Sequence, residues 1–266
     1  MMQKAAHIFR LYFYQAWYSY RSLFAWSTPF SYFTSKFGFP FFSMLMFVFM
    51  AKFAGLNDPA YIIIGNILLM PATNGIYGIS MTVGNERQFG AMSYLLGSPA
   101  PRAPLFLGRA FFHILDGLVS VIIALPIALL IFKVNISQVH VFLLLCCLVI
   151  LTITTTGLGF IMGSISLLSR DGWMFTNVIG QLLFILIGVN FAVSQLPRFL
   201  QPVSNFLPMT RVILATRQVL EGVGWSQISE LLVGEILVGL VYILFGYTLF
   251  RIIERASMST GSLDSI

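Results

Sequence analysis

Long uninterrupted runs of apolar residues recur along this chain, and they constrain its fold more than any other feature. Runs of about 20 or more such residues match the length that a helix needs to cross a hydrocarbon core of roughly 30 Å. Charged residues make up only 9% of the sequence, against 58% hydrophobic residues. Soluble domains carry about 25% charged residues, so this composition does not supply a water-facing surface. The sequence therefore predicts an all-α polytopic membrane protein.

The apolar runs predict six membrane-spanning helices within a single transmembrane domain that covers residues 1–266. The predicted spans are 34–54, 60–83, 105–132, 138–168, 173–194 and 231–251. If both termini are cytoplasmic, two thirds of the 15 Lys and Arg residues fall on the cytoplasmic side. Because Lys and Arg gather on that side of membrane proteins, we expect both termini to be cytoplasmic and the protein to lie in the cell membrane.

Residues 3–24 precede the first predicted span and predict an interfacial helix. Their polar side chains recur at steps of three or four residues, or multiples of them, while aromatic and aliphatic residues fill the other faces. The polar positions are Lys4, His7, Arg10, Tyr14 and Arg21. This pattern is typical of an amphipathic helix that lies on a membrane. The segment is either an active part of the protein or a plain anchor, and the sequence does not distinguish them.

Motifs of soluble catalysis are missing from the sequence. It contains no GxxxxGK[ST] phosphate-binding loop, no H-E-x-x-H and no Cys/His metal spacing. Cys146 and Cys147 are adjacent within an apolar run, which suits small core residues better than a disulfide. The net charge of +6 follows the cytoplasmic bias of Lys and Arg. We therefore expect membrane lipids rather than nucleic acid as contacts, and no metal or cofactor in this chain.

A polar insert, residues 84–101, separates the second and third predicted spans. We expect Glu86 and Arg87 to open a short helix, since an acidic residue is favourable near a helix N-terminus. Gly97 and the two prolines that follow it would end this helix. Its apolar face would consist of Phe89, Met92, Leu95 and Leu96. Such a helix can lie on the lipid surface or dock into a groove of a soluble partner.

The run ERQFGAMSYLLGSPAPR resembles the cytoplasmic coupling segment of the ABC-2 type transporter permeases, in which an acidic–basic pair and a glycine precede a short helix and a Ser/Thr-Pro turn. The matching positions are Glu86, Arg87, Gly90, Leu95, Leu96, Ser98 and Pro99. The chain departs from the pattern at 91–93, Ala-Met-Ser, where the family often has Thr-Leu-Glu, which puts one ion pair with a partner in question. The resemblance implies that this segment, including Phe89, contacts an ATPase subunit.

A second run, LPRFLQPVSNFLPMTRVILATRQVLEG at 196–222, is similar to the extracellular segment before the last helix in the same family. The matching positions are Leu196, Pro197, Pro208, Thr210 and Arg217. The prolines rule out a single straight span. We expect residues 195–222 to form short re-entrant or surface helices, whose free backbone groups are satisfied by protein or water. The alternative is an ordinary outer loop.

Three polar residues share one face of the third predicted span. Arg109, His113 and Asp116 are four and three residues apart, so they lie on the same side of a helix. An ionised carboxylate at the bilayer centre is unfavourable by about 2.5–3.5 kcal/mol. We consider two interpretations of Asp116 and its neighbours: the lining or latch of a cytoplasmic gate, and a structural pair near the membrane boundary.

Amides and one acid mark the last two predicted spans. Asn177 and Gln181 lie one turn apart on the fifth span, and Asn190 follows near its end. These amides either line a pathway or tie helices together. Glu235 on the sixth span is open to the same two interpretations, as a pathway group or as half of a boundary salt bridge. The G-x-x-x-G pattern at 159–163 predicts close helix packing.

The resemblance implies a permease subunit of an ABC exporter, which forms half of a translocation pathway. A second permease copy or a homologous permease would complete the pathway, and two cytosolic ATPase subunits would bind ATP and magnesium. Sparse intramembrane charge and the 26 Phe residues favour an amphiphilic or hydrophobic cargo, such as a drug, an antimicrobial peptide or a lipid. Export of a lipid-linked glycan is a related alternative. We expect Glu86→Ala to lower transport-coupled ATPase activity more than expression of the complex.

Two other classes stay open at this point. An ion-coupled secondary transporter would need an ion site, and often has an internal repeat, which the two halves of the sequence do not show. An integral membrane enzyme would need a cluster of acids or histidines at one membrane face. Only the face that carries residues 109–116 approaches such a cluster.

Overall fold

The computed structural model describes residues 2–23, 28–53, 55, 60–133, 139–168 and 172–260, and these parts of the chain contain helices but no strand. The long helices are α1 (Met2–Leu23), α2 (Pro29–Phe53), α3 (Ala60–Thr73), α4 (Ile79–Gln88), α6 (Arg102–Leu130), α7 (Val141–Ser166), α8 (Gly172–Leu186), α10 (Thr210–Leu220) and α11 (Trp225–Thr260). The short ones are η1 (Asn74–Gly78), α5 (Ala91–Gly97), η2 (Val193–Gln195) and α9 (Gln201–Phe206). Residues 24, 54 and 138, at which predicted segments begin or end, lie outside the described residues.

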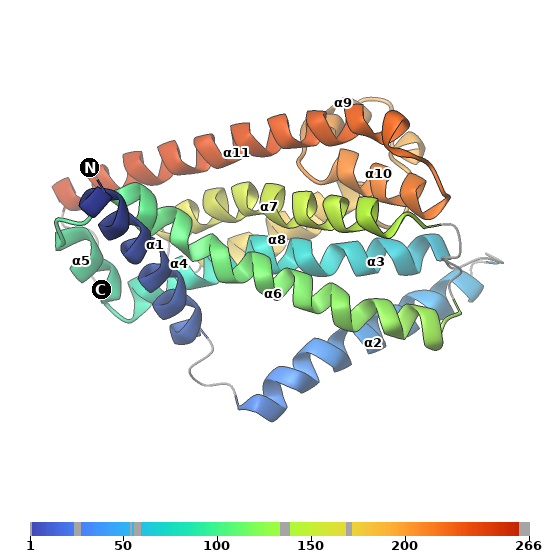
Figure 1. Ribbon diagram of the computed structural model, residues 1–266, viewed down its shortest axis with the longest axis horizontal. Coiled ribbons are helices and arrows are strands. Elements are labelled where there is room, and N and C mark those ends of the chain that lie inside the picture. Colours follow the sequence, from blue (N-terminus) through green and yellow to red (C-terminus); the bar gives the residue numbers. More distant parts are fainter. Residues whose placement is uncertain are drawn as a thin grey trace.

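The long helices form a bundle along one axis of the molecule (Figure 1). Helices α3, α6, α7 and α11 run along this axis, and α2 slants away from the others. Helix α1 begins and α11 ends at the same end as α5, which we call the α5 end. Helices α9 and α10 lie at the opposite end, which we call the outer end. The two segments that the sequence singled out therefore lie at opposite ends of the bundle.

Five helical segments of the described chain are long and apolar enough to cross a membrane. They are Pro29–Phe53, Ala60–Gln88, Arg102–Leu130, Val141–Ser166 and Trp225–Ser259. Each coincides with one of the six predicted spans. The predicted and observed helices agree for these five because bilayer thickness sets the minimum length of a spanning helix, and an apolar run of that length is visible in the sequence.

The predicted fifth span, 173–194, is wrong in its extent. Helix α8 ends at Leu186, and its apolar part, Met174–Leu186, is shorter than the other candidate spans. Gly188 has a φ of 78°, in the region that glycine adopts most easily, and it turns the chain out of the helix. Asn190 therefore lies in a turn at the outer end instead of on a helix face.

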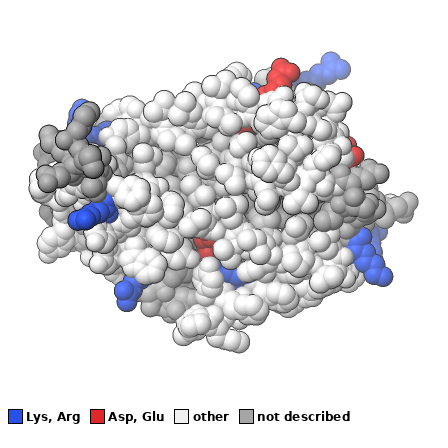
Figure 2. Space-filling model, in the orientation of Figure 1, with Lys and Arg blue, Asp and Glu red and all other residues white. Residues whose placement is uncertain are grey.

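The face of the bundle shown in Figure 2 carries little charge between its two ends. Figure 2 shows Lys, Arg, Asp and Glu side chains mostly at the two ends of the long axis, with a nearly uncharged band between them. Large apolar side chains are exposed on the candidate spans, including Phe49 on α2 and Leu240 on α11. Contiguous exposed apolar surface of this kind is unfavourable in water but is typical of a lipid-facing surface. The chain is a multi-pass membrane protein.

Small residues allow the helices around α7 to approach closely. A Cβ atom added at Gly159 would clash with the backbone carbonyl of Gly75 in η1. A Cβ atom at Gly157 would lie 2.8 Å from the Cβ atom of Tyr242 on α11. The packing role predicted for the G-x-x-x-G pattern is therefore confirmed at Gly159, which has no room for a side chain.

The second candidate span is interrupted by the π-helical turn η1. Pro71, which lacks a backbone N–H, lies just before this turn. A π-turn inserts an extra residue into the helical repeat and re-aims the side chains around it, often at functional sites. Here it places Asn74 toward α6 and Tyr77 toward α8, as their contacts with Ser120 and Phe184 show.

Candidate functional site

The polar insert begins differently from its predicted form. Glu86 and Arg87 lie in the last turn of α4 and do not open the short helix. The chain reverses at Gly90, which has a φ of 73°, and α5 then begins at Ala91. The prediction that Glu86 stands at a helix N-terminus is wrong, because contacts with other helices fix it inside α4. Arg87 is half-buried, and two of its guanidinium nitrogens have no partner among the described residues.

The outward surface of α5 is aromatic, but it is not the predicted face. Phe89 and Tyr94 are 77% and 85% exposed, whereas Met92 is 1% exposed and packs inward. Leu95 is half-buried, and Pro99, after the helix, is exposed. The side chain of Leu96 lies outside the described residues. Two large aromatic rings are thus exposed at the α5 end, one just before the reversal at Gly90 and one on α5 itself.

Beneath this helix, Glu86 is the centre of a buried polar cluster. Its Oε2 atom accepts hydrogen bonds from Nη2 and Nε of Arg109 on α6, at 2.6 and 3.0 Å. Its Oε1 atom accepts hydrogen bonds from Ser19 and Gln15 of α1, at 2.8 and 3.1 Å. The side chains of Glu86 and Arg109 are only 7% and 2% exposed. One carboxylate therefore joins α1, α4 and α6.

A second buried cluster joins the far end of the insert to the last helix. Arg102, at the start of α6, donates hydrogen bonds to the carbonyl oxygens of Leu95 and Ser98. Its Nε atom lies 2.7 Å from Oε1 of Glu254. The Oε2 atom of Glu254 lies 2.6 Å from Nη1 of Arg251. The Glu254 side chain is fully buried. The carboxyl end of α5 is thereby tied to α6 and α11.

Within the bundle, Asp116 of α6 pairs with Lys36 of α2. The Lys36 Nζ atom lies 2.5 Å from Oδ2 of Asp116, and the two side chains are 11% and 2% exposed. The hydroxyl groups of Tyr32 and Tyr20 donate to Oδ1 of Asp116, at 2.5 and 3.3 Å. Burial is the main reason that the pKa of Tyr20 rises to about 12, so its phenol stays protonated and available as a donor.

Hydrogen bonds extend this pair to the π-turn. Lys36 also donates to Ser120 at 3.1 Å, and Ser120 accepts a hydrogen bond from the Asn74 amide at 2.9 Å. Asp116 thus lies in a network that spans α1, α2, η1 and α6. Sequence reasoning missed Lys36 as its partner. The available signal was a lysine inside an apolar helix, which needs a buried acid nearby.

The three polar residues predicted on one face of α6 are all buried, but they have separate partners. Arg109 pairs with Glu86, and Asp116 pairs with Lys36. His113 lies between them, and its Nε2 atom is 3.0 Å from the Thr82 hydroxyl of α4. The three side chains therefore connect α6 to different neighbours and do not form one reactive cluster.

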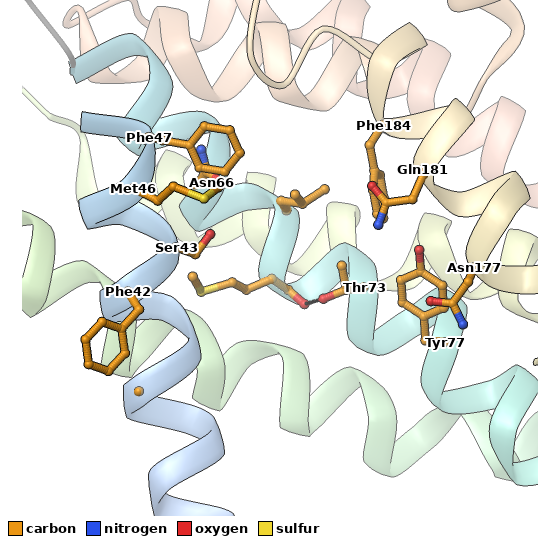
Figure 3. A pocket seen from close by; sticks show the side chains of 13 residues that line it. Phe42, Ser43, Met46, Phe47, Asn66, Thr73, Tyr77, Asn177, Gln181 and Phe184 are labelled. Carbon is orange, nitrogen blue, oxygen red and sulfur yellow. Dashed lines mark hydrogen bonds between the residues drawn. The ribbon is translucent and has the colours of Figure 1, made fainter. Parts of the chain in front are cut away.

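A cavity of about 750 Å³ lies between α2, α3 with η1, and α8. Figure 3 shows Met46 and Phe47 of α2 on one side, with Gln181 and Phe184 of α8 facing them across the cavity. Asn177 also lines it. The remaining lining residues labelled in the figure are Phe42, Ser43, Asn66, Thr73 and Tyr77. The cavity is thus mainly apolar, with several amides and hydroxyl groups, which is typical of a small-molecule site.

At the outer end of this cavity two amides meet. Asn66 of α3, which lines the cavity, lies with its Nδ2 atom 3.4 Å from Oδ1 of Asn190. Of the three predicted pathway amides, the structure therefore places Asn177 and Gln181 on the cavity wall. It places Asn190 beside the wall, in contact with a lining residue.

The predicted outer segment, 195–222, begins at the last residue of η2 and contains α9 and α10, with turns between them. Pro197 is exposed before α9, and Pro208 is buried between α9 and α10. Thr210 begins α10. Glu235 of α11 is fully buried and accepts a hydrogen bond from the Met209 backbone N–H at 2.5 Å. Among the described residues this acid therefore fixes the start of α10 and does not form the predicted salt bridge.

Arg217, the last predicted residue of this segment, is buried in the last turn of α10. Its Nη2 atom donates to the Val189 carbonyl at 2.6 Å, and its guanidinium lies over the Tyr61 ring, 3.3 Å from the ring centre. It thereby joins α10 to the chain after α8 and to the start of α3. The contacts of Arg217 and Glu235 together place α10 across the outer end of the bundle.

These features describe a polytopic membrane protein with an apolar cavity in its bundle and a short helix held at one end by buried ion pairs. The chain belongs to the ABC-2 type transporter family, whose pattern matches residues 14–220. The match begins within α1 and ends with α10. No curated protein matches the chain. Family membership makes it a membrane transport component of an ABC transporter rather than a catalytic subunit.

Proposed function

We propose that this chain is the permease subunit of an ATP-driven exporter and forms half of a pathway for an amphiphilic or hydrophobic cargo. Two separate ATPase subunits bind ATP and magnesium and dock at the α5 end. In this arrangement α1, α5 and both termini face the cytoplasm, and the outer end faces outward across the cell membrane. The short helix α8 provides the sixth crossing together with the outer segment, which enters the membrane from outside.

The observation that carries this proposal is that α5 is held by buried ion pairs while aromatic side chains beside and on it are exposed. Phe89, just before α5, and Tyr94, on α5, are exposed, while the two ends of this segment are anchored by the Glu86 cluster and the Arg102–Glu254 pair. Large aromatic side chains at the centre of a contact contribute strongly to protein–protein binding. Because buried ion pairs connect the segment around α5 to α1, α6 and α11, a displacement of α5 would also displace these helices. This is the mechanical requirement for coupling ATP hydrolysis to helix movement.

The cavity supports the second half of the proposal. Its walls come from three helices of one chain, and a second permease copy beside α2 and α8 would close it into a shared pathway. Phenylalanine and methionine side chains suit an acyl or aromatic part of a cargo, and Asn177 and Gln181 suit a polar group. Asp116 pairs with Lys36, and Glu235 accepts a hydrogen bond from the Met209 backbone N–H. Neither acid lines this cavity, so the cavity itself offers no carboxylate for ion coupling among the described residues.

We expect Tyr94→Asp and Phe89→Asp to abolish co-purification with the cognate ATPase while leaving the permease folded. Both side chains are exposed, so their replacement does not disturb the core, whereas an acid in a desolvated contact is unfavourable. The measurement is pull-down from detergent after co-expression, with the monodisperse peak of the permease as the check on folding. Phe199→Asp is the matched control, since Phe199 is 75% exposed at the outer end.

Retention of the ATPase by both variants would contradict docking at α5. Loss of the ATPase in Phe199→Asp as well would show that any exposed acid disrupts the complex, and would remove the support for a specific surface.

We expect Gln181→Phe to lower transport of amphiphilic dyes by about fivefold, which corresponds to roughly 1 kcal/mol. Gln181 lines the cavity, so a larger ring occupies space that the cargo needs and removes a hydrogen-bonding group. The assay is ATP-dependent dye uptake into inverted vesicles that contain the permease and its ATPase. Val178→Phe serves as the control, because Val178 is exposed on α8 but does not line the cavity. Equal transport by the two variants would contradict a cargo site in this cavity.

A further inference from the structure

A second, smaller cavity lies at the outer end of the bundle, separate from the proposed cargo site. Its volume is about 250 Å³, against roughly 30 Å³ for one water molecule in the liquid. It is bounded by Tyr61 of α3, by residues 192–194 after α8, by Asn205 of α9 and by one face of α10. The polar residues of α10 on this face are Thr210 and Arg217, which lie two turns apart.

Arg217 is held rigidly at one wall of this outer cavity. Its contacts with the Val189 carbonyl and the Tyr61 ring use one nitrogen and one face of the guanidinium. A Cβ atom added at Gly65 would clash with that carbonyl and would lie 3.0 Å from Nη2 of Arg217. Glycine at position 65 therefore provides the space in which the guanidinium is seated.

Two nitrogens of this guanidinium have no partner. Nε and Nη1 of Arg217 are buried and form no hydrogen bond within the described chain, and the whole residue is 8% exposed. No acidic side chain forms a salt bridge with Arg217 among the described residues. Burying a charge without a counter-charge is strongly unfavourable. An anionic group bound next to Arg217 would therefore supply the missing counter-charge and stabilise the buried guanidinium.

Thr210 adds a second unpartnered donor to the same cavity. It is the first residue of α10 and is 6% exposed, and its buried hydroxyl has no hydrogen-bond partner in the described chain. The amino end of α10 already holds an acid, because Glu235 accepts a hydrogen bond from the Met209 backbone N–H. A hydroxyl and a guanidinium thus border one small space.

The charge of Arg217 persists at neutral pH. Burial lowers its pKa to about 10, while Glu221, in the next turn of the chain, raises it. Glu221 is exposed, so water screens it. The guanidinium is therefore still cationic at physiological pH, although burial weakens its hold on the proton.

We propose that the outer cavity binds a phosphate group through the guanidinium of Arg217 and the hydroxyl of Thr210. The rest of the cavity wall is mainly apolar, with Ile213 and Leu214 of α10 among its members. A phosphate carried by a lipid headgroup and free phosphate share this chemistry. The site lies at the outer end of the bundle, where we expect lipid headgroups, and its function does not depend on ATPase docking or on cargo.

Native mass spectrometry of the full-length protein in detergent tests this site. Three probes are compared: inorganic phosphate, short-chain phosphatidylglycerol, and a galactosyl diacylglycerol that lacks phosphate. We expect saturable binding of a phosphate-bearing probe and at least tenfold weaker binding of the galactolipid. Binding of phosphatidylglycerol alone identifies a lipid headgroup as the ligand, and binding of inorganic phosphate alone identifies a free anion. Absence of both from the wild-type protein overturns the proposal.

Two variants connect that binding to the outer cavity. Arg217→Gln is expected to weaken binding about tenfold. Thr210→Val, which keeps the side-chain volume, is expected to weaken it about threefold. Arg198→Gln removes an exposed positive charge from the same outer segment and should change binding less than twofold. Because Arg217→Gln also loses the Val189 contact, Thr210→Val decides the outcome if that variant does not fold. Wild-type affinity in Thr210→Val, or equal loss in Arg198→Gln, overturns the proposal.

Discussion

Replacing Glu86 with alanine is expected to lower the free energy of unfolding by about 3–5 kcal/mol, the usual effect of removing one partner from a buried ion pair. The substitution leaves Arg109, which is 3% exposed, without its counter-charge. It also removes the acceptor for Ser19 and Gln15 of α1. Thermal unfolding in detergent, followed by intrinsic fluorescence, measures the change.

This expectation differs from the one that the sequence suggested. A Glu86 exposed on a coupling helix would affect ATPase coupling more than expression, whereas a buried Glu86 is expected to lower expression and stability as well. Glu230→Ala is the control, because Glu230 is an exposed acid on α11. The double variant Glu86→Leu/Arg109→Met should recover most of the stability, since no charge stays unpaired. A Glu86→Ala protein as stable as the Glu230→Ala control would contradict the buried pair.

The second large effect is expected at Lys36 and Asp116. Lys36→Met alone, or Asp116→Leu alone, should each lower the free energy of unfolding by about 3 kcal/mol or more, because each leaves a buried charge. The double variant should be closer to the wild type than either single variant. The coupling energy from this double-mutant cycle isolates the pair. The pair also holds α2 against α6.

Additive losses in the cycle would contradict a direct pair between Lys36 and Asp116. Substitution of Lys52, an exposed lysine at the other end of α2, by methionine provides the reference for removing a charge from this helix. Its effect should stay within about 0.5 kcal/mol, as is usual for surface positions.

Sequence patterns predicted most of the helices and few of their partners. Span length and composition are local properties, and they identified five of the spans. The extent of the fifth failed because Gly188 changes the backbone direction inside an apolar run. Helical spacing also placed Arg109, His113 and Asp116 on one face correctly, but spacing reveals a face and not what lies opposite. Their partners come from other helices, far away in the sequence.

The polar insert shows the same limit on a smaller scale. An acidic residue before a short apolar run is normally favourable at a helix start, and this predicted the wrong role for Glu86. The burial of Glu86 against α1 and α6 dominates that local preference and extends α4 to Gln88. The sequence pattern also did not predict that Phe89 and Tyr94 are both exposed, because the reversal at Gly90 changes the helical phase between the two rings.

The stoichiometry of the purified complex tests the central claim most directly. The chain is co-expressed with its cognate ATPase, purified through a tag on the chain, and weighed by native mass spectrometry. The account predicts an assembly of two permease chains and two ATPase chains, which separates into its subunits when Tyr94→Asp is introduced. A well-folded chain that captures no ATPase, or one that captures it equally with Tyr94→Asp, would contradict a permease driven through α5.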